Sequence, residues 1–181
     1  LQQLYTHITN WKMISAAEIL SKLPTSQGEF ELIKKRQYVP DIINEICTAH
    51  KLNGKLYDRF SYLFYDSDAE VVAETLHDFC RRNIEYKEET VHMQTSLLPQ
   101  GIIADGFGDC KHYALFCGGV IGSLCRLYGC GFDWQYFFAG YRGAKEPYHV
   151  FVTVDYEDTE LWLDPTPGSG GTPSVYEKRR V

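Results

Sequence analysis

The chain has 181 residues, of which 44% are hydrophobic and 23% charged, and its formal net charge is −6. A chain of this length suits one domain, or one domain with an elaborated end, and can bury a sizeable core. The negative charge argues against a nucleic-acid partner, and no apolar run approaches the ~20 residues of a membrane span. We therefore expect a folded protein with no nucleic-acid or membrane partner. No signal peptide is visible, although the chain starts at Leu1 rather than Met.

Helix signals dominate the first two thirds of the chain. Proline suits the first helical position and can start a helix at Pro40. The pattern from Ser67 to Glu70 is a capping box, and Asp109 can cap a helix that Gly129 ends. The predicted helices cover residues 15–23, residues 40–46 and beyond, residues 67–83 and residues 109–129.

Between and after these helices the chain is predicted to be extended or irregular. Residues 84–91 are predicted to be extended, and residues 95–108 are predicted to be a loop because they carry a proline and three glycines. Three strands are predicted in the last third, at 134–141, 148–156 and 160–164. Helices followed by an antiparallel sheet indicate the α+β fold class.

The six cysteines form no CxxC pair, and four of them fall between residues 110 and 130, mostly on one predicted helix. Neighbours on one helix do not make a disulfide framework, so the pattern favours free thiols in a reducing compartment. The paired short spacings of a zinc site are missing. We therefore expect no metal and no cofactor.

Cys110, His149 and Asp164 occur in this order, each at the edge of a predicted element. A nucleophilic thiol needs a base beside it and a third group that holds the base. A helix N-terminus favours the thiolate, and the backbone N–H of Cys110 is a natural oxyanion donor. The preceding glycines, Gly106 and Gly108, leave the approach to the sulfur open. This combination predicts a thiol nucleophile.

Strand parity predicts that His149 and Asp164 share one face of the sheet. If the turn near Glu157 and Asp158 has an even number of residues, alternation places both side chains on the same side. Asp164 could then orient the imidazole. Singly, each of the three residues has an ordinary structural explanation, and Lys111 and His112 are predicted to lie at the surface.

At Gly108-Asp109-Cys110 the sequence resembles the transglutaminase-like superfamily, whose catalytic core is related to the papain-like cysteine peptidases. Residues 71–86, 149–152 and 162–165 are similar to other parts of that core, most of all in bacterial and phage-encoded members. The resemblance implies a nucleophile helix packed on an antiparallel sheet in residues 67–167. It leaves residues 1–66 as an N-terminal helical extension packed on the core, and residues 168–181 as a flexible C-terminal tail.

In that family the Cys attacks an amide carbonyl, the His shuttles protons and the Asp orients the His. These roles fall on Cys110, His149 and Asp164. The resemblance therefore implies a cysteine-dependent amide hydrolase or acyltransferase, foremost a peptidase, that acts on a protein or peptide through a thioester acyl-enzyme. Many relatives use an upstream side chain as a second oxyanion donor, and Gln94 is preferred here over Gln100.

The alternative is a non-catalytic binding or structural module that keeps the fold, for example in a virion. The expected location is the cytoplasm, or a virion if the chain is phage-encoded, where it could belong to a larger assembly; the oligomeric state stays open. Part of residues 1–66 is expected to line the approach to Cys110, with the loop from Gly140 to Pro147 on the opposite side.

Overall fold

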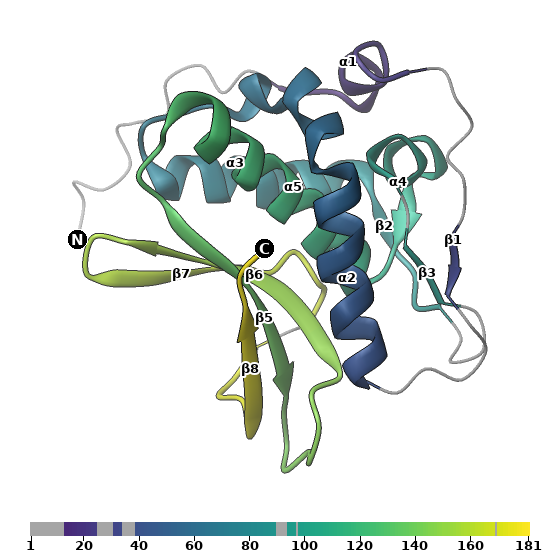
Figure 1. The fold of residues 1–181 in the computed structure, drawn as a ribbon, viewed down its shortest axis with the longest axis vertical. Coiled ribbons are helices and arrows are strands. Elements are labelled where there is room, and N and C mark those ends of the chain that lie inside the picture. Colours follow the sequence, from purple (N-terminus) through teal and green to yellow (C-terminus); the bar gives the residue numbers. More distant parts are fainter. Residues whose placement is uncertain (1–12, 25–30, 34–38, 90–93, 97, 169) are drawn as a thin grey trace.

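The computed structural model describes residues 13–24, 31–33, 39–89, 94–96, 98–168 and 170–181. Helices form one part of the molecule and an antiparallel sheet the other, so the α+β class is confirmed (Figure 1). The first elements are α1 (Ala16–Leu20), β1 (Glu31–Ile33), α2 (Val39–Asn53) and two 3₁₀ helices, η1 (Gly54–Arg59) and η2 (Ser61–Phe64).

The described part of the N-terminal segment contains two α-helices and two 3₁₀ helices, and it also contributes a strand. Pro40 lies in the first turn of α2, where its missing N–H leaves no bond unmade. β1 pairs antiparallel with β3 (Gln94–Ser96), which lies well beyond the predicted extension. The prediction of a purely helical extension is therefore wrong at β1, because a strand this short is completed by a partner that is distant in sequence.

The middle of the chain contains one predicted and one unpredicted helix. α3 (Ala69–Asn83) begins where the capping signal placed it, with Asp68 rather than Ser67 as the cap. The predicted loop 95–108 instead contains α4 (Pro99–Asp105) and the short strand β4 (Phe107–Gly108), which pairs with β2 (Glu85–Tyr86). Pro99 occupies the first turn of α4, and Gly106 ends it with φ 66°, so the supposed breakers mark its two ends.

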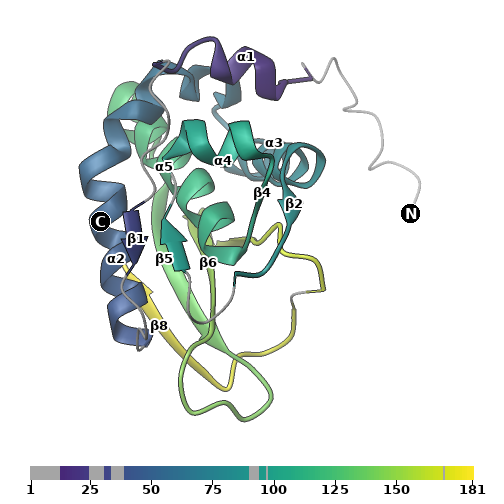
Figure 2. The ribbon, with the colours of Figure 1, turned by 90° about the vertical axis from the view of Figure 1, so that its right-hand side faces the viewer.

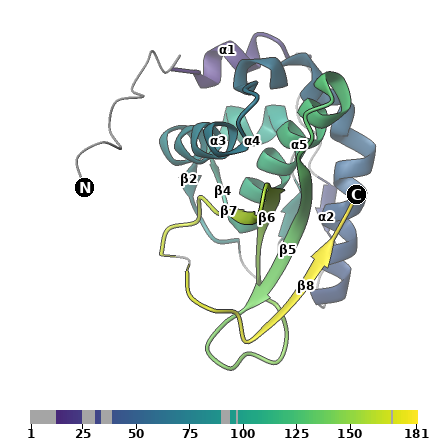
Figure 3. The ribbon, with the colours of Figure 1, turned by 90° about the vertical axis from the view of Figure 1, so that its left-hand side faces the viewer.

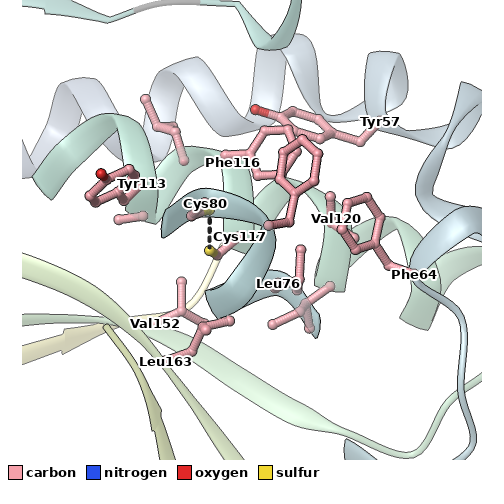
Figure 4. Close-up of a cluster of buried hydrophobic side chains, with 14 of the residues drawn as sticks. Tyr57, Phe64, Leu76, Cys80, Tyr113, Phe116, Cys117, Val120, Val152 and Leu163 are labelled. Atoms are coloured by element: carbon pink, nitrogen blue, oxygen red, sulfur yellow. Dashed lines mark hydrogen bonds between the residues drawn. The ribbon is translucent and has the colours of Figure 1, made fainter. Parts of the chain in front are cut away.

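The helix α5 (Cys110–Tyr128) runs through the centre of the molecule. Every residue from Lys111 to Ile121 is buried, as expected of a helix that is covered on all sides. One side packs on the sheet and another on η1, and Phe116 lies among the rings of Tyr57 and Phe64 (Figure 4). The ends of α5 agree with the sequence prediction, because Asp109 caps it and Gly129 ends it in the left-handed conformation.

The sheet has four strands in the order β7-β6-β5-β8, with every neighbouring pair antiparallel. The three predicted strands are present as β5 (Asp133–Gly140), β6 (His149–Tyr156) and β7 (Thr159–Leu163). The face of the sheet toward α5 carries Val152 and Leu163, which join the main core (Figure 4). The opposite face carries Phe137 and Phe151 in stacked contact.

The fourth strand, β8 (Val175–Arg179), corrects the prediction of a flexible tail over residues 168–181. It pairs with β5 along its whole length, from Val175 opposite Gly140 to Arg179 opposite Tyr136 (Figure 3). Charged side chains are common on edge strands because they discourage pairing with another chain. The charged residues Glu177, Lys178 and Arg179 are therefore typical of the edge position that β8 occupies.

The helix α2 runs beside the sheet and is attached to it by a buried polar contact (Figure 2). Nδ1 of His50 lies 2.9 Å from the hydroxyl of Tyr136 on β5. Burial, and to a lesser degree the charge of Arg126, lowers the pKa of His50 to about 4. The His50 side chain is therefore neutral near pH 7, which suits its place between apolar layers. Within the described residues, no helix combines the length and apolarity needed to cross a membrane.

Candidate active site

Cys110 is the first residue of α5, and its side chain is partly exposed. At this position the backbone N–H groups have no carbonyl partner one turn earlier, and the helix dipole favours negative charge. The short strand β4 leads directly into the cap, so the chain reaches Cys110 through Gly108, which is buried. A Cβ at Gly108 would lie 2.7 Å from Cβ of His112, so only glycine fits this approach.

The first turn of α5 holds a buried polar network, which corrects the surface positions predicted for Lys111 and His112. Lys111 is 2% exposed and His112 is 1% exposed. The ammonium of Lys111 lies 2.6 Å from Glu89 and 2.5 Å from Asp109, while Nδ1 of His112 accepts from the Asp109 N–H at 3.0 Å. The sequence prediction was wrong here because the burial of Lys111 depends on Glu89, which reaches it from a separate segment.

Asp109 caps α5 and is strongly held in its charged form. Burial raises the pKa of Asp109, but its close contact with His112 and the charge and hydrogen bond of Lys111 lower it by more, to about 2. Its Oδ1 accepts from the N–H of Lys111 at 3.1 Å. The carboxylate therefore faces the helix N-terminus and the ammonium of Lys111. These contacts reduce the extent to which its negative charge destabilises a thiolate at Cys110.

His149 and Asp164 meet as strand parity predicted. The turn between β6 and β7 has two residues, Glu157 and Asp158, and Val152 lies opposite Leu163. His149 and Asp164 thus project from the same face, and Nε2 of His149 lies 2.7 Å from Oδ2 of Asp164. The second oxygen of Asp164 accepts from the Thr166 N–H at 3.1 Å, which fixes the carboxylate beside the ring.

The His149 ring is shared between Asp164 and Cys110. Burial lowers the pKa of His149, but the hydrogen bonds to Asp164 and Cys110 and their charges raise it by more, to about 9. The ring is 8% exposed, so these two partners dominate its surroundings. The structure therefore brings the three predicted residues together and favours an imidazolium beside the thiol.

A cavity of about 440 Å³ opens beside Cys110 and His149. Ile42 and Ile43 of α2 form part of its wall, and Pro147 and Tyr148 form another part. Part of the N-terminal segment and the end of the loop before His149 therefore line the approach to Cys110, as the sequence predicted. Tyr86, which belongs to the family resemblance, also lines the cavity, together with Glu88 and Glu89, for which the sequence analysis found no signal.

The predicted oxyanion side chain cannot be placed. The backbone of Gln94 lies in β3, opposite Ile33, but its side chain is outside the described part of the structure. The second candidate, Gln100, is 6% exposed on α4 and does not line the cavity. In the described residues there is no cluster of three or more His, Cys, Asp or Glu side chains that could hold a metal ion.

Comparison with known proteins finds a distant structural similarity. Neither a family model nor a curated protein sequence matches the chain. The chain is similar to a solved structure of a proposed cysteine protease from Cytophaga hutchinsonii, with 17% identity and a TM-score of 0.43. The match covers 76% of this chain and 49% of the other, so the chain spans about half the length of that protein. The function has to be argued from the site itself.

Proposed function

We propose that the chain is a cysteine peptidase with a transglutaminase-like, papain-related core, in which Cys110, His149 and Asp164 form a catalytic triad. The observation that carries the proposal is the contact of Nε2 of His149 with Asp164 at 2.7 Å, at a cavity that His149 and Cys110 line together. A protein or peptide amide is the proposed substrate, and no cofactor takes part.

The proposed reaction begins with the thiolate of Cys110, paired with the imidazolium of His149. The sulfur attacks the amide carbon, and the oxygen becomes an oxyanion that the Cys110 N–H can stabilise at the N-terminus of α5. His149 donates its proton to the leaving amine, the C–N bond breaks, and a thioester remains on Cys110. Asp164 keeps the ring oriented and stabilises its positive charge throughout.

The second half of the reaction distinguishes hydrolysis from acyl transfer. His149, now neutral, takes a proton from water, and the resulting attack releases the carboxylic acid and regenerates the thiolate. An amine that replaces the water would instead form a new amide. Both outcomes use the same residues, so the acceptor is the point at which a peptidase and an acyltransferase differ.

A peptide library with mass-spectrometric readout tests the proposal. Cys110→Ser should abolish turnover, and Asp164→Asn should lower kcat/KM by about 10²–10⁴-fold while the fold is retained. The wild-type protein, stopped rapidly in acid, should carry an acyl mass on the peptide that contains Cys110. His149→Gln should prevent formation of that acyl species.

Cys47→Ser is the matched control, because Cys47 is a half-buried thiol on α2 outside the cavity. Burial raises the pKa of Cys47, so its removal should leave turnover unchanged. Turnover that survives Cys110→Ser would identify another nucleophile. If Cys110 is alkylated no faster than Cys47 and no peptide is cleaved, the chain is instead a binding or structural module.

A further inference from the structure

The cavity beside Cys110 has an apolar wall and an acidic wall. Ile42 and Ile43 on α2 and Phe138 and Val150 on the sheet provide apolar surface. The last residue of β2 provides Tyr86, and the segment that follows β2 provides the carboxylates Glu88 and Glu89. A ligand that enters the cavity therefore meets both hydrocarbon and negative charge.

The cation in this lining is already engaged. Lys111 is 3% exposed at its side chain, and its ammonium is held between Glu89 at 2.6 Å and Asp109 at 2.5 Å. The ammonium of Lys111 is thus paired with a carboxylate on each of two segments. The imidazolium of His149 is likewise paired, with Asp164 at 2.7 Å. Neither cation of the described lining is thus available to an acidic ligand.

Glu88 adds a negative charge that forms no ion pair with any other residue in the described part of the chain. Its side chain is exposed, and its carboxylate accepts a long hydrogen bond, 3.5 Å, from the neutral hydroxyl of Tyr86. The neighbouring Lys87 does not neutralise it, because its ammonium lies over the ring of Phe107, 4.7 Å from the centroid. Burial and then the charges of Cys110, Glu88 and Asp109 raise the pKa of Tyr86, which is consistent with a negative field there.

Resting on the proposed peptidase function, we propose that the cavity selects a substrate with a lysine or arginine side chain next to the scissile amide, and that Glu88 is the residue that sets this preference. Lysine and arginine have apolar stems and charged ends, so the stem can lie on Ile42 and Ile43 while the charge reaches Glu88. The face of the Tyr86 ring can add a cation–π contact. A substrate with an acidic side chain there would be repelled.

Charged thiol reagents measure this preference without any turnover. A cationic and an anionic alkyl methanethiosulfonate each form a mixed disulfide with Cys110 and release methanesulfinate. Mass spectrometry of the Cys110 peptide measures the rate of each reaction. The ratio of the cationic rate to the anionic rate is then divided by the same ratio for 2-mercaptoethanol. This normalised ratio reports the charge of the cavity. At low ionic strength we expect the cationic reagent to be favoured at least about fourfold, because one nearby charge changes the two rates about twofold each, in opposite directions.

Glu88→Gln should lower this ratio about fourfold, since the charge acts on both reagents in opposite directions. Glu85→Gln is the matched control, because Glu85 is an exposed carboxylate on β2 that does not line the cavity, and it should leave the ratio unchanged. A normalised wild-type ratio near one, or a Glu88→Gln ratio equal to the wild-type ratio, overturns the inference.

Peptides that differ only by arginine or citrulline at the positions beside the cleaved bond complete the test. We expect kcat/KM to be at least about tenfold higher for arginine at one position, and the preference to shrink in Glu88→Gln. Equal cleavage of both peptides overturns the inference and leaves the proposed function standing. A cationic preference in the reagent assay without cleavage of any peptide overturns the proposed function and leaves the charge selectivity of the cavity standing.

Discussion

The contact between His149 and Asp164 sets the charge of the candidate site. A carboxylate 2.7 Å from Nε2 and a thiol on the same ring outweigh the burial that would keep the imidazole neutral. The pKa of about 9 lies above the unfolded value of 6.5. The imidazolium therefore contributes stability that is fully present below pH 6.5 and is lost as the pH rises through about 9.

Asp164→Asn should lower the pKa of His149 by at least about one unit, because it removes the first partner that raises it. The measurement is the pH titration of the ring protons of His149 by NMR. In the wild-type protein the unfolding free energy should decrease by about 3 kcal/mol at most between pH 6.5 and 9. In Asp164→Asn this decrease should be smaller. Asp133→Asn, which removes a surface carboxylate paired with Arg180, should change neither. An unchanged His149 titration in Asp164→Asn would contradict the role assigned to Asp164.

The helix α5 can be central because glycines let large rings approach its backbone. A Cβ at Gly119 would lie 2.3 Å from the ring of Tyr57, and one at Gly118 would lie 2.6 Å from the hydroxyl of Tyr136. These contacts are shorter than any real Cβ tolerates. The glycines, which weaken the helix by itself, therefore fix the distance between α5 and the layers on either side.

Gly119→Ala should destabilise the protein by about 1–2 kcal/mol, measured by chemical denaturation. Alanine in a helix interior gains about 0.5–1 kcal/mol over glycine, but overpacking a rigid buried contact costs about 1–3 kcal/mol, and here the ring of Tyr57 has little room to move. The comparison is Gly131→Ala, where nothing lies within 4 Å of the added Cβ. Equal stability of the two variants would show that Tyr57 can shift without penalty.

At the scale of the whole molecule, the last strand completes the sheet that carries His149. β8 covers the free edge of β5, and its Tyr176 stacks on Phe137 with ring centroids 5.1 Å apart. On the other side of β5, His149 lies opposite Ala139. The strand β5 thus links the C-terminal strand to the strand that positions the candidate base.

Removal of residues 168–181 should lower the melting temperature and make the protein prone to aggregation. The truncation leaves the edge of β5 unpaired and removes the Tyr176 ring from Phe137, and an exposed apolar edge pairs readily with another chain. Thermal denaturation and light scattering measure the two effects. The milder variant Tyr176→Ser keeps the strand, so it should lose stability without aggregating. A truncated protein as stable as the full chain would mean that β8 contributes little.

The sequence was most informative where a signal is local. Capping residues located α3 and α5, and alternation located β5 to β7 and the shared face of His149 and Asp164. The sequence did not predict α4, because Pro99 and Gly106 are as common in loops as they are at the two ends of a short helix. β8 and the burial of Lys111 were missed because each depends on a partner distant in sequence, β5 in one case and Glu89 in the other.

The arrangement of the cysteines decides how the protein should respond to oxidants. Cys80 and Cys117 lie 3.7 Å apart, and Cys125 and Cys130 lie 3.3 Å apart, whereas Cys110 is the one cysteine in the described lining of the cavity. Burial raises the pKa of Cys117, and that of Cys125 to about 12, so these thiols stay protonated. Peroxide should therefore attack Cys110 first and form a sulfenic acid. With no second thiol in that lining to resolve it as a disulfide, recovery would depend on a thiol supplied from solution.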